Sequence, residues 1–167
     1  MIFLFMLYIS LLAPREASAQ QGPDVALIEA AAAQYARAQF VKGTVAFDSS
    51  NAFLRSSGLP VSTRSQAELA QLSQALGGAR VGALSAFRIC SVPTNSNTCA
   101  LHGVDAVLSM TRPVIAGDTA VVLVRIFSAH RGSDGRAFTS SRSERIQVAH
   151  QGSHWIATKT LPGGSIS

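Results

Sequence analysis

Residues 119–129 read TAVVLVRIFSA, and this stretch decides the fold class of the chain. Apolar residues, many of them β-branched, occupy both of its alternating faces, which is typical of a central strand covered by a helix. Three further stretches rich in Val, Ile, Thr and Phe lie around it, at residues 104–112, 137–150 and 155–161. Turn-forming residues separate the four stretches. Because strands joined by short turns pair antiparallel, the sequence predicts a four-stranded meander.

The third of these strands also predicts which side chains share a face. Phe138, Ile146 and Val148 lie on one face, because alternate residues of a strand point the same way. The opposite face is expected to be in contact with solvent and consists of Thr139, Ser141, Ser143 and Arg145.

A last turn centred on Gln151 and Gly152 predicts the register of the final strand. Direct cross-strand partners share a face of the sheet, so apolar residues should lie opposite apolar ones and an acid opposite a base. The predicted pairs are Val148 with Trp155, Ile146 with Ala157, and Glu144 with Lys159.

The first half of the chain has helical signals. Apolar residues recur at helical spacing over residues 24–42, and Gly43 follows as a stop signal. Residues 44–48 predict a short strand, and the Ser-rich stretch through residue 60 predicts a loop. Ser65 and Glu68 have the spacing of a capping box, which predicts a second helix that ends at Gly77 and Gly78. Residues 81–90 are expected to be extended, so the whole order of elements predicts the α+β class.

The first residues of the chain have the features of an export signal. Residues 2–12 are apolar apart from Ser10, which is the length of a signal-peptide core and too short for a membrane-spanning helix of about 20 residues. A small-x-small site follows at residues 17–19, so a signal peptide over residues 1–19 and a mature domain over residues 20–167 are expected. No basic residue precedes the apolar run, so a retained anchor and a start at Met6 stay open as alternatives.

Two cysteines, Cys90 and Cys99, flank a turn-forming segment. In an oxidising compartment such a pair predicts a disulfide, because a metal site needs more ligands and a redox site usually has CxxC spacing. A disulfide also removes the best candidate nucleophiles of the chain.

The composition favours a compact basic domain. Hydrophobic residues make up 47% and charged residues 14% of the 167 residues, and the formal net charge is +5. A positive charge favours anionic partners such as envelope polymers. The basic residues form no run and do not alternate with aromatic residues, which argues against a nucleic-acid partner.

A long first helix, a short strand, a second helix and a meander ending in Gly-Ser-His-Trp at residues 152–155 resemble the NTF2-like families, whose curved sheet wraps around the first helix. The resemblance implies a pocket between helix and sheet. Enzymes of these families use a pocket carboxylate and a hydrogen-bond donor, and by residue type Asp105 and Tyr35 would be their counterparts here. Nothing in the sequence places these two together, and many members of the families are binding domains without activity.

Other catalytic and metal-binding patterns are absent from the sequence. No serine lies in a Gly-x-Ser-x-Gly elbow, and no glycine motif of a phosphate-binding loop occurs. A hairpin symmetric about residue 116 would bring His102 near His130, but a zinc site would need more ligands. We therefore expect no catalytic residue, no metal and no cofactor.

Two binding surfaces are candidates. Arg131 and Arg136 would lie at the tip of the hairpin between the second and third strands, as an anion-binding edge. The larger apolar residues most simply form the core, but in a cone-shaped fold some of them would line a ligand pocket. The pocket candidates are Tyr35, Phe87, Met110, Phe127 and Trp155.

The expected function is that of an exported, non-enzymatic NTF2-like domain that binds a small apolar ligand or a protein partner. The first alternative is an envelope-associated protein that binds anionic surfaces through its Arg-rich hairpin. The second is a small isomerase or hydrolase that uses a pocket acid.

Overall fold

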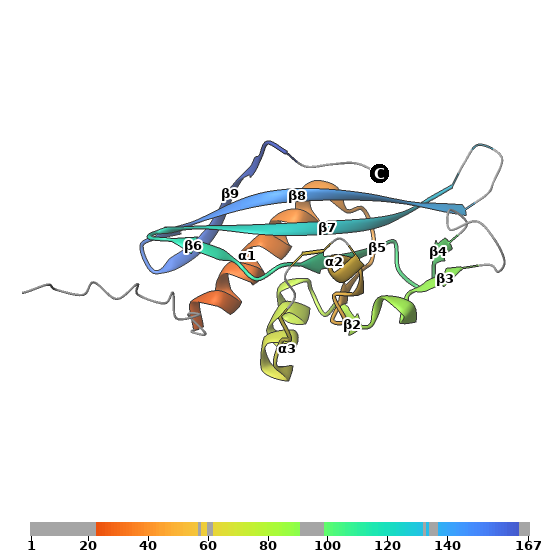
Figure 1. The fold of residues 1–167 in the computed structure, drawn as a ribbon, viewed down its shortest axis with the longest axis horizontal. Helices are drawn as coiled ribbons and strands as arrows, with labels where there is room; N and C mark the ends of the chain where they lie inside the picture. Colours follow the sequence, from red (N-terminus) through yellow and green to blue (C-terminus); the bar gives the residue numbers. More distant parts are fainter. Residues whose placement is uncertain are drawn as a thin grey trace, which may run out of the picture.

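The computed structural model of the protein describes residues 23–56, 58–59, 62–90, 99–131, 133 and 137–163. Helices and one mixed main sheet confirm the α+β class (Figure 1). The helices are α1 (Pro23–Phe40), α2 (Ala52–Ser56), α3 (Gln66–Ala75) and the 3₁₀ helix η1 (Leu84–Ala86). The strands are β1 (Val45–Asp48), β2 (Arg80–Gly82), β3 (Arg88–Cys90), β4 (Cys99–Leu101), β5 (Ala106–Met110), β6 (Val114–Ala116), β7 (Thr119–Arg131), β8 (Ala137–Gln151) and β9 (His154–Leu161).

The main sheet is larger than the predicted four-stranded meander. It has seven strands in the order β2-β1-β5-β7-β8-β9, with β6 paired to β7. β5, β7, β8 and β9 are antiparallel neighbours, whereas β1 and β2 extend the sheet with parallel pairing. The predicted strand over residues 104–112 is shortened to β5, and a further strand, β6, follows outside the predicted range. Pro113 lies between them, and proline has no N–H for a sheet hydrogen bond.

The predicted register of the last hairpin is wrong. Gln151 pairs with His154, so the turn residues are Gly152 and Ser153, and Val148 lies opposite Ala157. Gly152 has a φ of 63°, as in two-residue hairpin turns that begin with glycine. A bulge between Gln147 and Val148 shifts the pairing once more.

Helix α1 forms as predicted and packs on one face of the sheet. Ile28, Ala32, Ala33 and Ala36 are fully buried in this contact. The small alanine side chains allow the helix backbone to lie close to the strands. We call this face of the sheet the α1 side.

The capping box that begins α3 is also confirmed. Ser65 Oγ accepts a hydrogen bond from the N–H of Glu68, and the Glu68 carboxylate accepts one from the N–H of Ser65. The segment predicted as a loop contains the short helix α2, where Ser50 Oγ accepts from the N–H of Ala52. A five-residue helix is too short to produce a periodic apolar pattern in the sequence, which is why it was missed.

The opposite face of the sheet, which we call the outer face, carries a second core. Its buried residues are Ala46, Leu84, Phe87, Val104, Val107 and Phe127, with Leu101 of β4 packed against them. The prediction that one face of β8 is in contact with solvent is therefore only partly correct. Ser141 and Ser143 are buried on the outer face, where β4 lies against β8.

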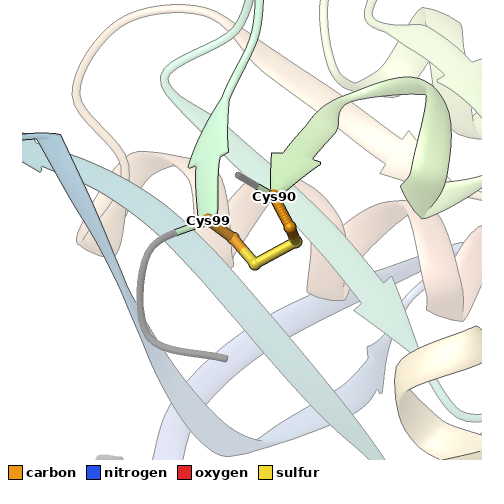
Figure 2. The surroundings of a disulfide bond; sticks show 2 residues. All are labelled: Cys90 and Cys99. Atoms are coloured by element: carbon orange, nitrogen blue, oxygen red, sulfur yellow. A yellow bond between two sulfur atoms is a disulfide. The ribbon is translucent and has the colours of Figure 1, made fainter. Parts of the chain in front are cut away.

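The two-stranded sheet of β3 and β4 is closed by the Cys90–Cys99 disulfide, as predicted (Figure 2). Cys99 is buried, whereas Cys90 is exposed. The disulfide thus fixes the small hairpin whose Leu101 packs on the outer core.

Candidate functional site

The five candidate pocket residues do not lie together. Tyr35, Met110 and Trp155 belong to the core on the α1 side. Phe87 and Phe127 belong to the core of the outer face. The sheet separates the two groups, so they cannot line a single cavity.

Two shallow recesses lie elsewhere. One, of about 450 Å³, is lined by residues of the second half of α1, of the segment that follows it and of the end of α3, including Gln34, Arg37 and Val41. The other, of about 360 Å³, lies between α3 and the first strands and is lined by Ser49, Ser73 and five further residues. Neither recess is lined by any of the five candidates.

The two residues suggested by the family resemblance differ in environment. Asp105 is exposed and accepts hydrogen bonds from the N–H and hydroxyl of Thr44, at 2.6 and 2.7 Å. These bonds lower the pKa of Asp105. Tyr35 is partly buried and makes an edge-to-face contact with Phe40, with ring centroids 6.4 Å apart. Asp105 is thus a well-solvated carboxylate engaged in fixing a loop.

His102 and His130, the two histidines that a symmetric hairpin would bring together, each interact with other residues. The backbone N–H of His102 donates to the carbonyl oxygen of Phe87. His130 Nε2 lies 2.7 Å from Ser140 Oγ, and its ring stacks on Phe138 with centroids 5.2 Å apart. Among the described residues, no three His, Cys, Asp or Glu side chains come together as a metal site requires.

The arginines along strands β7 and β8, next to the predicted anion-binding edge, are distributed over two faces. Arg125 and Arg145 lie on the outer face, whereas Arg142 lies on the α1 side, as the cross-strand pairing requires. Arg131 ends β7, opposite Ala137, and its side chain is outside the described part of the structure. Arg136 also lies outside the described residues.

Strands β7 and β8 continue beyond the end of α1 (Figure 1). β5 pairs with β7 as far as Ser128, and past that residue β7 and β8 form a two-stranded ribbon. Arg142 packs over the ring of Phe40, 4.4 Å from its centroid, at the point where α1 ends. Arg142 Nε donates to Glu144 Oε1 at 2.8 Å, and Nη2 donates to the same oxygen. The buried carboxylate therefore holds the guanidinium in a fixed position against an aromatic ring.

The same face of the ribbon carries more polar and aromatic side chains toward its tip. His130 is exposed, and Phe138 is 44% exposed although it is a large apolar residue. Because alternate residues of a strand share a face, Phe138, Ser140, Arg142 and Glu144 follow one another along β8. We call the following six residues the ribbon patch: Phe40, His130, Phe138, Ser140, Arg142 and Glu144.

Sequence reasoning did not identify the ribbon patch. The signal was present, because Arg142 and Glu144 alternate in phase with the inward residues Ile146 and Val148. When an acidic and a basic residue lie on the same face of a strand as buried apolar residues, they indicate an ion pair that is partly buried.

A second ionic cluster lies inside the molecule and has a structural role. Glu29 and Arg64 form a buried pair, and Arg112 lies 3.4 Å from Glu29 and also binds Glu68. The hydrogen bond from Arg112 lowers the pKa of Glu68 to about 2. Asp48, likewise buried, accepts bonds from Ser50, Leu84 and Ser109.

No protein-family model matches the chain, and no match to it was found among curated proteins or solved structures. None of the helices in the described ranges has the length and apolar character needed to cross a membrane.

Proposed function

We propose that the mature chain is an exported, non-enzymatic binding domain of the NTF2-like type that binds a protein partner through the ribbon patch. The observation that carries the proposal is the exposed Phe138, stacked on His130 in line with the Arg142–Glu144 pair. Aromatic and arginine side chains at the centre of a surface patch are typical of residues that dominate binding between proteins.

The packing on the α1 side favours a binding site on the surface of the protein over a ligand pocket between α1 and the sheet. Ile28, Ala32, Ala33 and Ala36 are fully buried in the core cluster between helix and sheet. A small apolar ligand would need room there, which favours the protein partner among the expected binding partners.

A photo-crosslinking amino acid at position 138 tests this proposal in the producing cell. We expect one adduct of defined mass from position 138 and none from position 145, which lies on the opposite face of β8 and is exposed. The double variant Arg142→Gln/Glu144→Gln, which leaves no buried carboxylate without its partner, should remove the adduct without lowering the melting temperature by more than a few degrees. Equal adducts from both positions, or an adduct that survives in the double variant, would count against the ribbon patch.

Export is proposed on the apolar run at residues 2–12, the small residues at 17–19 and the disulfide, which persists in oxidising compartments. The intact mass of the protein recovered from producing cells tests it. We expect a chain that begins at Gln20 with Cys90 and Cys99 oxidised. A full-length chain in the membrane fraction would support the retained anchor instead.

A further inference from the structure

Strand β2 lies at one edge of the main sheet, where it pairs with β1. Phe47 of β1 lies opposite Val81, and the N–H of Ser49 donates to the carbonyl oxygen of Gly82 at 2.9 Å. In a parallel pair, alternate residues of a strand turn their backbone groups toward the neighbouring strand. Gly82 is therefore bonded to β1, whereas the N–H and C=O of Val81 point away from the sheet.

The residue just before β2 has its backbone groups bonded by helix α3. The N–H of Ala79 donates to the carbonyl oxygen of Ser73 at 3.1 Å. Ser73 Oγ donates in turn to the carbonyl oxygen of Ala79 at 2.7 Å. A single residue of α3 thus satisfies both backbone groups of Ala79, as a neighbouring strand would.

Beyond Ala79 this edge of the sheet is open. Ala83 continues the chain after β2 in extended conformation, with a φ of −65° and a ψ of 147°. Its N–H points to the same side as that of Val81, because the direction of the backbone groups alternates along an extended chain. Within the part of the chain that the structure describes, the N–H and C=O of Val81 and the N–H of Ala83 have no hydrogen-bond partner.

A recess lies along the same edge. It has a volume of about 360 Å³ and lies between α3 and β2, which are neighbours in the fold (Figure 1). Leu69, Ala70 and Ser73 of α3 line one side of it, and Val81 lines the other. Leu69 and Val81 also pack against the core on the α1 side, so apolar side chains line its inner part. Such a recess suits an apolar side chain of a segment that runs along β2.

We propose that the free edge of β2 binds an extended segment of a partner protein as an additional strand, with one apolar side chain of that segment in the recess. Main-chain hydrogen bonds to Val81 and Ala83 supply affinity, and the recess supplies selectivity for the side chain. The unpaired backbone groups decide in favour of an extended segment, because its own N–H and C=O groups alternate in the same way. The site shares no residue with the ribbon patch and is independent of it.

Selection of short random peptides displayed on phage, with the oxidised mature chain as the target, tests the site. We expect the selected peptides to share one large apolar residue and to bind with a saturable Kd. At saturation, hydrogen exchange at the N–H groups of Val81 and Ala83 should slow by about tenfold or more, because an N–H paired in a sheet is protected. Unchanged exchange at both groups, or a selection without a saturable peptide, would overturn the site.

Two alanines of α3 provide a matched test of the recess. Both Ala67 and Ala70 are exposed, but only Ala70 lines the recess. Ala70→Leu fills part of the recess and should raise the Kd of the selected peptide about tenfold or more. Ala67→Leu adds the same atoms elsewhere on the helix and should change the Kd less than about twofold. Equal Kd values in the two variants would overturn the role of the recess.

The backbone pairing is tested by Ala83→Pro. Proline adopts the φ of Ala83 and removes its unpaired N–H, so the variant should keep the melting temperature of the parent. It should nevertheless raise the Kd of the selected peptide about tenfold. Binding equal to that of the parent would overturn the added strand.

A second copy of the chain is the other occupant that a free strand edge attracts. Sedimentation of the parent and of Ala83→Pro in the absence of peptide distinguishes the two. We expect both proteins to be monomers with respect to this edge. A parent dimer that dissociates in Ala83→Pro would show that β2 pairs with a second copy, and would overturn the partner segment.

Discussion

Both carboxylate oxygens of Glu29 are held by Arg64, with Oε2 2.9 Å from Nε and Oε1 3.0 Å from Nη2. The two side chains are 0% and 2% exposed. Arg64 also donates to the carbonyl oxygen of Met110 and to Asn51 Oδ1. One guanidinium therefore joins α1, the segment before α2 and the end of β5.

Removal of one partner of this pair should destabilise the protein strongly. Arg64→Leu leaves the Glu29 carboxylate buried without its main partner, and breaking a buried pair typically costs about 3–5 kcal/mol. Urea unfolding measures the change in the free energy of unfolding. Arg55→Leu on the protein surface is the control and should change it by less than about 0.5 kcal/mol. A loss below about 1 kcal/mol in Arg64→Leu would mean that the interior readily adapts to the missing cation.

The Glu68–Arg112 pair should make stability depend on pH in the acid range. The folded-state pKa of Glu68 is lowered from 4.5 to about 2, so the folded protein binds its proton more weakly than the unfolded chain does. The stabilisation is complete above pH 4.5 and is lost as the pH falls from 4.5 toward 2. Urea unfolding between pH 6 and pH 2 should therefore show a steeper acid loss in the parent than in Glu68→Gln.

Glu68→Gln is a sharp test because Gln at this position keeps the capping box of α3. The difference in stability between parent and variant should be largest near neutral pH and nearly absent at pH 2. A difference that stays constant over the whole range would show that the carboxylate charge does not contribute.

Glu68 and Arg64 differ in how far along the chain their partners lie, and this difference decides which of their contacts could be predicted from the sequence. The capping box depends on Ser65 and Glu68, three residues apart, and was predicted from that spacing. The partners of Arg64 lie 35 and 46 residues away, and only the packed fold brings them together. The same reason hides the Phe40–Arg142 contact, which joins the end of α1 to a strand a hundred residues later.

Errors in the sheet have a related cause. The turn at Gly152 was predicted, but its position was misplaced, which changed every pair of the last hairpin. The prediction of the α+β class depended only on the spacing of apolar residues along the chain. It was therefore correct although the predicted register of the last hairpin was wrong. The parallel strands β1 and β2 join the sheet through long connections, which no short-range signal specifies.

Loss of the disulfide should destabilise the protein moderately. Cys90→Ser combined with Cys99→Ser opens a ring of about ten residues, which in the loop-entropy model costs about 2.5–3 kcal/mol. The unfolding midpoint of the double variant should match that of the parent in reducing buffer. A midpoint equal to that of the oxidised parent would show that the β3–β4 hairpin keeps its place without the bond.

A larger side chain placed between α1 and the sheet tests whether this part of the core has unfilled volume. Ala36 is fully buried on the α1 side, whereas Ala38 is exposed on the same helix, so Leu at the two positions adds the same atoms to different surroundings. In a filled core Ala36→Leu should cost about 1–3 kcal/mol, because extra methyl groups force neighbouring side chains and backbone to move. Ala38→Leu should stay within about 0.5 kcal/mol of the parent, as surface substitutions usually do. If Ala36→Leu were as stable as Ala38→Leu, the helix and sheet would enclose unfilled volume, and a small apolar ligand would again be a better candidate than a protein partner.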